Sequence, residues 1–167
     1  MTATLTERET LTKPILSIQQ PWAWLILRPD VIAESERAAL YETGEIKDVE
    51  NRTWKLPKTI CGDPVELPLE FYVHAGQRFD HEGYRYVRQH WPDIPMPTLV
   101  SDFPTGGIVG EAEITGCIGA DDWNPSEWCM GDWGFLIRRA KPLRFKPLKG
   151  ALGFFRVPAR LIEASEL

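Results

Sequence analysis

The sequence predicts an α+β domain in which short strands curl into a small barrel with flanking helices. Five or six short stretches have strand composition and two or three have helical spacing, which favours a curled sheet over a doubly wound parallel one. Apolar and polar residues alternate along residues 107–118, as in a strand with one wet face. The 167 residues suffice for one domain. We expect it over residues 14–160, after a flexible N-terminus over residues 1–13.

The first half of the predicted domain contains a strand, two helices and an extended segment. Residues 15–18 are a short apolar strand candidate, and Pro21 suits the first turn of a helix, where its missing N–H costs nothing. Residues 22–27 are apolar nearly all round, which is typical of a short buried helix. A second helix is predicted over residues 31–42, with a glycine as its stop. Residues 46–54 are expected to be extended.

The second half of the predicted domain is rich in strands. Residues 69–74 have strand composition. Asp80 can cap a helix whose apolar residues recur at spacings of three and four. Residues 92–104 form a proline-rich connection, and further strands are predicted over residues 133–145 and 152–157.

Composition and charge exclude several classes of protein. Hydrophobic residues make up 43% and charged residues 26%, as in ordinary globular domains, so disordered and fibrous classes are excluded. A net charge of −5 argues against sequence-independent binding to long duplexes. No apolar run approaches the length of about 20 residues that a membrane helix needs, and the polar start does not resemble a signal peptide. We therefore expect a cytoplasmic protein that does not bind membranes.

Cofactor motifs are missing from the sequence. The cysteines are odd in number and have no C-x-x-C spacing, and the histidines lack the spacing of metal ligands. The glycine-rich motifs of nucleotide triphosphatases and dinucleotide-binding proteins, and the G-x-S-x-G of serine hydrolases, are also missing. We expect no metal and no cofactor.

Positive charge is concentrated near the C-terminus. Residues 133–162 contain no acidic residue and eight cations, namely Arg138, Arg139, Lys141, Arg144, Lys146, Lys149, Arg156 and Arg160. Alternation along a strand would place Arg139 and Lys141 on one face, opposite to their neighbours. We predict that two or three of these cations, with Arg139, Lys141 and Lys149 as candidates, form a phosphate-facing rim beside the ligand site. A solvated basic face is the alternative.

Lys47, Glu50 and Arg52 form a cation, anion, cation cluster in the chain. In a strand Glu50 and Arg52 share a face and Lys47 points the other way, so joint action requires Lys47 in a turn or at a bulge. In a cleft, Arg52 can hold a phosphate or Glu50. Glu50 can accept from an exocyclic amine or act as a general base, and a partly desolvated Lys47 can serve as a base. An exposed ladder of charges is the alternative.

Aromatic and polar residues near this cluster are further candidates. Trp22 and Trp54 can stack on a base, which is worth about 1–3 kcal/mol per base, and Gln20 can add polar recognition. Tyr41 and His74 are candidates for proton transfer. For His74 a neutral core histidine is the alternative.

Four segments resemble ASCH (activating-signal-cointegrator homology) domains and follow the order of that family. They are LSIQQPWAW at residues 16–24, GEIKDVENRTW at 44–54, YVHAG at 72–76 and KGALGFFRV at 149–157. The family's hallmark G-x-x-K-x-x-E-x-R is matched by Gly44, Lys47, Glu50 and Arg52. The resemblance covers residues 14–158. It implies a PUA-like barrel (pseudouridine synthase and archaeosine transglycosylase type), with a cleft beside the helix that follows the first strand.

The resemblance implies a range of activities, because fold alone does not determine chemistry. The superfamily includes RNA-binding modules, readers of modified bases and a few hydrolytic enzymes. In its small amidohydrolases that act on N4-acetylcytidine, the motif lysine works with a threonine three residues later. Here Glu50 stands at that position, which argues against that reaction. Gln19 stands where relatives often carry Arg or Lys, so one phosphate-binding charge is missing.

Three functions remain open at this point. The first is a binding module that recognises RNA or a modified nucleotide in a cleft between the Gln-Pro-Trp helix and the motif. The alternative is a metal-independent hydrolase, either a ribonuclease or a modified-nucleoside amidohydrolase, that uses Lys47 and Glu50. A protein-interaction adaptor would instead present several tryptophans on a flat patch rather than in a concavity.

Overall fold

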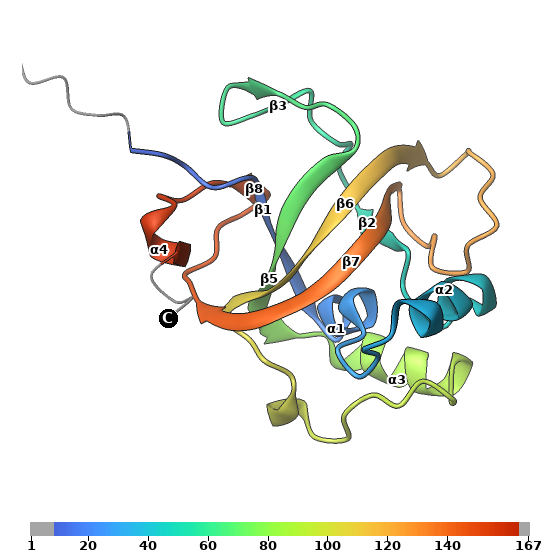
Figure 1. Ribbon diagram of the computed structural model, residues 1–167. Helices are drawn as coiled ribbons and strands as arrows, with labels where there is room; N and C mark the ends of the chain where they lie inside the picture. The colour runs from blue at the N-terminus through green and yellow to red at the C-terminus, as the bar shows by residue number, and fades with distance from the viewer. Residues whose placement is uncertain (1–8, 164–167) are drawn as a thin grey trace, which may run out of the picture.

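One curled sheet of six strands dominates the computed structural model, which describes residues 9–163 (Figure 1). The strand order is β2-β7-β6-β5-β1-β8, and β1 and β5 are parallel while all other neighbours are antiparallel. The strands are β1 (Ile15–Gln20), β2 (Val49–Arg52), β5 (Leu69–Phe79), β6 (Gly107–Gly119), β7 (Trp133–Pro147) and β8 (Phe154–Phe155). A separate small hairpin pairs β3 (Thr59–Ile60) with β4 (Asp63–Pro64).

The sheet is open, and β2 and β8 are its two edges. β8 is only two residues long and pairs with Ile15 and Leu16 alone, so it leaves the rest of that side of β1 free. Side chains bridge the gap instead, since the Trp54 ring lies edge-on to Phe154 with centroids 5.9 Å apart. The α+β class is confirmed. The strands do not close into the predicted barrel, because β8 is too short to pair with β2.

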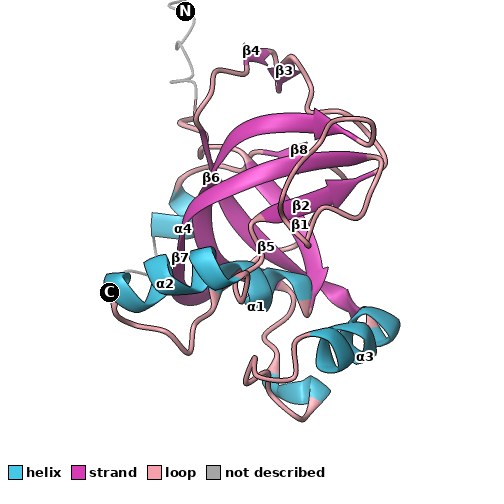
Figure 2. Ribbon diagram, turned by 90° about the vertical axis from the view of Figure 1, so that its right-hand side faces the viewer, coloured by secondary structure: helices cyan, strands magenta, loops and turns pink. Residues whose placement is uncertain are grey.

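Helices gather at one end of the curled sheet (Figure 2). They are α1 (Trp22–Leu27), α2 (Glu34–Thr43) and α3 (His81–His90), while α4 (Arg160–Glu163) and a 3-10 turn (Val100–Asp102) complete the set. The side chain of Asp80 accepts a hydrogen bond from the Gly83 N–H at 2.8 Å and caps α3 as predicted. An N-cap aspartate satisfies one of the free amides of a first helical turn.

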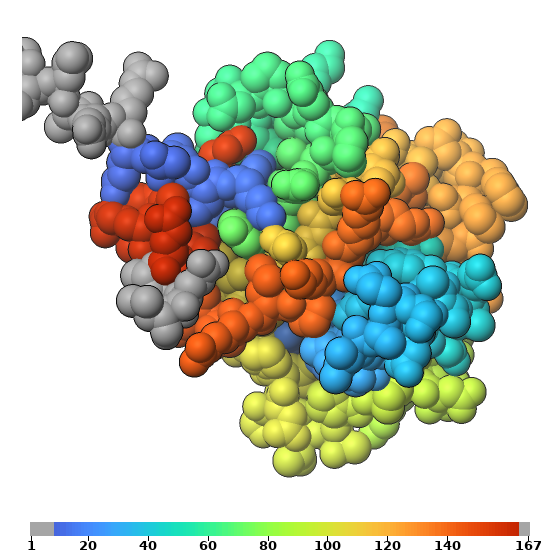
Figure 3. Space-filling model, in the orientation of Figure 1, coloured from blue at the N-terminus to red at the C-terminus, as the bar shows by residue number. Residues whose placement is uncertain are grey.

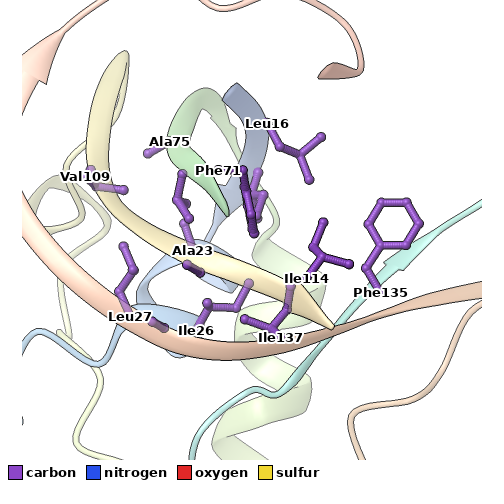
Figure 4. Packing of buried hydrophobic residues seen from close by; sticks show 14 residues of the cluster. Leu16, Ala23, Ile26, Leu27, Phe71, Ala75, Val109, Ile114, Phe135 and Ile137 are labelled. Atoms are coloured by element: carbon purple, nitrogen blue, oxygen red, sulfur yellow. The ribbon is translucent and has the colours of Figure 1, made fainter. Parts of the chain in front are cut away.

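The core lies inside the curl of the sheet and is completed by α1. Ala23, Ile26 and Leu27 of α1 pack against apolar side chains of the strands, among them Ile114 and Ile137 (Figure 4). The helix is apolar nearly all round because it is surrounded, as the sequence predicts. α1 therefore fills one end of the curl.

Several boundaries differ from those predicted. β2 is shorter than the extended segment 46–54, because the Lys47 N–H bonds to the Leu25 carbonyl of α1 rather than to a strand. Most of the predicted flexible N-terminus, residues 1–8, lies outside the described residues. Residues 10–12 pair with residues 157–159 through backbone hydrogen bonds, so paired backbone is present before the predicted boundary at residue 14.

Candidate functional site

A cavity of about 410 Å³ lies where the curled sheet fails to close, between β1 and β2 and beside α1. β1 and β2 are side by side in Figure 2, and the Arg52 guanidinium reaches across from β2 to the Ser17 carbonyl of β1 at 2.7 Å. The residues that line the cavity are Ser17, Gln19, Trp22, Lys47, Glu50, Asn51, Arg52 and Met130. The motif and the Gln-Pro-Trp helix therefore meet in one concavity.

Lys47 lies in the turn between α2 and β2, outside the strand, which is the placement that joint action with Glu50 requires. The side chain is 2% exposed. Its Nζ donates to the Val49 carbonyl oxygen and lies 3.3 Å from Glu50 Oε2. Burial lowers the pKa of Lys47, and the adjacent Glu50 carboxylate opposes that shift. The ammonium is thus held by one carboxylate and one carbonyl in a nearly dry position.

Glu50 and Arg52 share one face of β2, as alternation predicts. Glu50 Oε1 lies 3.7 Å from the Nε of Arg52 while Oε2 faces Lys47, so the carboxylate lies between two cations. The Arg52 Nε–H is buried and has no hydrogen-bond partner among the described residues. The local net charge of this trio is positive, which favours an anionic or electron-rich ligand.

Trp22 forms the aromatic wall of the cavity and is held in place from behind. Its indole N–H donates to Asp80 Oδ2 at 3.0 Å, so one carboxylate both caps α3 and fixes the ring. Gly83 packs so closely on Trp22 that a Cβ there would lie 2.4 Å from the ring. Lys47 Nζ lies 5.6 Å from the ring centroid, within the range of a cation–π contact.

Sequence reasoning missed three lining residues, which are Ser17, Asn51 and Met130, and it noted Gln19 only as the place of a missing charge. Asn51 accepts hydrogen bonds from the Met130 and Gly131 amides and donates to the Trp128 carbonyl, so it holds the 128–131 loop against the site. Its place inside the motif was a signal available in the sequence. Met130 had no such signal, because the chain returns to the site about eighty residues later.

Two predicted ligand-binding residues have structural positions instead. The Gln20 side chain is 1% exposed and bonds to the Trp24 amide and the Pro104 carbonyl, so its polar atoms are already paired. The Trp54 ring packs edge-on against Phe135 and Phe154. Neither residue lines the cavity.

Tyr41, Arg139 and Lys141 line a different and larger hollow of about 850 Å³. β7, drawn in orange beside α2 in Figure 3, supplies the two cations. Burial raises the pKa of the Tyr41 hydroxyl. No cation of the 138–160 run lines the Lys47 cavity. The predicted rim is therefore not formed by Arg139 and Lys141.

The alternation predicted for this part of β7 is wrong because of a β-bulge. Glu111 pairs with Lys141 and Glu113 with Arg138, so Arg139 and Ala140 together face a single residue of β6. Arg139 has a φ of +53°. The extra residue leaves both Arg138 and Arg139 exposed, whereas simple alternation would turn one of them inward.

His74 and Lys149 line a third cavity, of about 450 Å³, which shares Ser17 with the Lys47 cavity. His74 is 2% exposed, and its Nε2 lies 2.7 Å from the Leu148 carbonyl oxygen. Its Nδ1 lies 3.0 Å from the Ser17 Oγ. Of the eight cations between Arg138 and Arg160, Lys149 lines this His74 cavity, which adjoins the Lys47 cavity at Ser17.

Comparisons with known proteins leave the family of this chain undetermined. The sequence matches no protein-family model, and no curated protein is significantly similar to it. Within residues 9–163 no group of three or more His, Cys, Asp and Glu side chains is placed to hold a metal ion. None of the helices described there has the length and hydropathy that a membrane span requires.

Proposed function

We propose that this chain is an ASCH-type, PUA-like domain that binds one nucleotide unit, from RNA or from a modified nucleotide, in the Lys47 cavity. The observation that carries the proposal is that Trp22, Lys47, Glu50 and Arg52, drawn from two separate segments, line a single concavity. Its volume of about 410 Å³ falls within the range of small-ligand sites.

Each lining group suits one part of a nucleotide. The Trp22 ring offers a flat face for a base. The Glu50 carboxylate accepts hydrogen bonds from an exocyclic amine or a ring N–H. The Arg52 Nε lies 3.7 Å from Glu50 Oε1, beyond hydrogen-bond distance, so this buried donor is available to a carbonyl or phosphate oxygen. The ligand is therefore a base with both a donor and an acceptor edge.

The PUA-like assignment rests on the motif resemblance together with the open curled sheet. Side chains complete on one side what backbone pairing would complete in a barrel, through Arg52 to Ser17 and Trp54 to Phe154. A ligand in the gap between β1 and β2 would occupy the space in which these two strands do not pair. The cavity is thus a consequence of the way the sheet ends.

The exposure of the tryptophans argues against an adaptor. Trp123 is 86% exposed, and the other six are buried or half-buried. A flat patch of several tryptophans is therefore missing from the described part of the chain, in contrast to what an adaptor surface requires.

A metal-independent hydrolase in the same cavity is the second candidate. Burial lowers the pKa of Lys47, and a lowered pKa favours a lysine as a general base. Metal-free turnover of short RNAs or acetylated nucleosides, lost in Lys47→Met, would establish this candidate over simple binding.

The test of binding is a calorimetric titration with cytidine, N4-acetylcytidine, adenosine, their 5′-monophosphates and short single-stranded RNAs. We expect at least one of these ligands to bind, and Trp22→Ala to weaken that binding about fivefold or more, since stacking is worth about 1–3 kcal/mol. Trp123→Ala removes an exposed tryptophan that does not line the cavity and is the matched control. Equal affinities in the two variants would overturn the proposal.

A further inference from the structure

The Ser17 hydroxyl and the His74 imidazole form a pair whose geometry the binding function does not use. They stand directly opposite each other in the parallel pair β1 and β5. Ser17 Oγ lies 3.0 Å from His74 Nδ1. The hydroxyl is half-buried and lines two cavities, whereas the imidazole is 2% exposed.

The Leu148 carbonyl determines which ring nitrogen carries the proton. It lies 2.7 Å from His74 Nε2, and a carbonyl oxygen only accepts, so Nε2 is the donor. In the neutral ring Nδ1 is then unprotonated and accepts from the Ser17 hydroxyl. Leu148 is itself held by its N–H on the Gly106 carbonyl. The order hydroxyl, imidazole, oriented carbonyl is that of a nucleophile, its base and the group that positions the base.

The backbone closes on the pair from the side of Gly150. A Cβ at this position would lie 2.7 Å from His74 Cε1 and 3.0 Å from Ser17 Oγ. The Phe155 ring packs edge-on to the imidazole, with centroids 6.1 Å apart. These contacts restrict the ring to one orientation.

A cation with one unpaired donor lies beside Ser17 and lines the same cavity as this residue. Arg52 Nη2 bonds to the Ser17 backbone carbonyl at 2.7 Å, which places the guanidinium next to this residue. The Arg52 Nε–H is buried and unpaired among the described residues. A partly buried cation beside the attacked carbonyl can stabilise the oxyanion that develops there.

We propose that Ser17 and His74 form a nucleophilic dyad that accepts acyl groups from small esters. Ser17 Oγ bonds to the acyl carbon while its proton passes to His74 Nδ1, and the carbonyl electron pair moves to the oxygen beside Arg52. Collapse breaks the bond to the alcohol oxygen, which takes the proton from Nδ1. Water then attacks the acyl-serine, gives its proton to Nδ1, and that proton returns to Ser17 as the carboxylic acid leaves. The step needs no metal or other reactant.

The test is labelling with a fluorophosphonate–biotin probe, which captures activated serines, with the modified peptide located by mass spectrometry. We expect one adduct, on Ser17, that disappears in urea. Ser17→Ala should remove it, while Ser101→Ala, at an exposed serine, should not. His74→Gln should slow labelling about 10²-fold or more, the usual contribution of a general base. Release of p-nitrophenol from p-nitrophenyl acetate should show the same order of variants.

Two further measurements test folding and nucleotide binding independently of the dyad. Circular dichroism of Ser17→Ala, which removes one oxygen atom, tests whether the fold persists. A nucleotide titration of His74→Gln tests binding independently of the adduct, because His74 does not line the Lys47 cavity, and its affinity should match that of the wild type. Folded wild-type protein without an adduct on Ser17, or equal labelling in His74→Gln, would overturn the dyad and leave the nucleotide proposal untouched.

Discussion

Arg52 donates a hydrogen bond from Nη2 to the Ser17 carbonyl oxygen at 2.7 Å, across the gap that strand pairing leaves open. β8 covers β1 only as far as Leu16, so the next free carbonyl is available to a side chain. The same guanidinium is 3.7 Å from Glu50. One arginine therefore joins the edges of the sheet and forms part of the cavity wall.

Arg52→Lys should destabilise the protein by about 1–2 kcal/mol, because a lysine keeps the charge but cannot hold both partners, and hydrogen bonds to charged groups contribute on this scale. Urea denaturation followed by fluorescence gives the free energy of unfolding. Arg144→Lys changes an exposed arginine of β7 and should alter that free energy by less than about 0.5 kcal/mol. Equal effects of the two substitutions would show that the bridge carries no stability.

Titration of Lys47 should make the free energy of unfolding increase with pH above neutrality. Burial lowers its pKa from the ordinary value of 10.5, so the folded protein releases this proton at a lower pH than the unfolded chain does. Between these two pKa values the unfolded state binds more protons, and the free energy of unfolding increases with pH.

The comparison with Lys47→Met tests this contribution, because the variant lacks the Lys47 amine. Urea denaturation at pH 7, 8, 9 and 10 should show that the free energy of unfolding of the wild type, minus that of the variant, grows as the pH approaches 10.5. A difference that stays constant over this range would mean that burial does not lower the pKa of Lys47 in the folded protein.

Asp80 links the stability of α3 to the position of Trp22. Asp80→Ala should cost about 1 kcal/mol or more through loss of the helix cap, and it should also weaken ligand binding because the indole N–H loses its acceptor. Asp80→Asn keeps one carbonyl oxygen and can serve only one of the two donors. We expect it to retain more stability than Asp80→Ala in thermal unfolding while still lowering affinity. Unchanged affinity in both variants would show that Trp22 needs no anchor.

The cations of the β7 bulge should not contribute to binding in the Lys47 cavity. Arg139→Gln combined with Lys141→Gln should change nucleoside affinity by less than about twofold, as is usual for distant sites. Lys149→Gln is the informative comparison, because Lys149 lines the cavity that adjoins at Ser17. If it contacts a phosphate of a short RNA, its loss should reduce the salt slope of log affinity by about 0.7. A reduced slope in the double variant instead would place the RNA backbone on β7.

Local patterns in the sequence determined most of the elements. Alternation predicted β6 and the cap at Asp80 predicted α3, because each depends on residues close together in the chain. The contact of Lys47 with Glu50 is also local, since only the placement of the lysine in a turn was left open. The ASCH resemblance, which no comparison tests, stays a prediction.

Tertiary structure decided the rest. Ser17 meets His74 across 57 positions of sequence, and Arg52 meets Ser17 across 35, contacts for which no spacing rule exists. The bulge at Arg139 and the early end of β8 depend on register between strands, which is set by the packing of the whole sheet. Local preferences determine the helices and strands, whereas the pairing of distant strands determines where the cavity lies and which side chains line it.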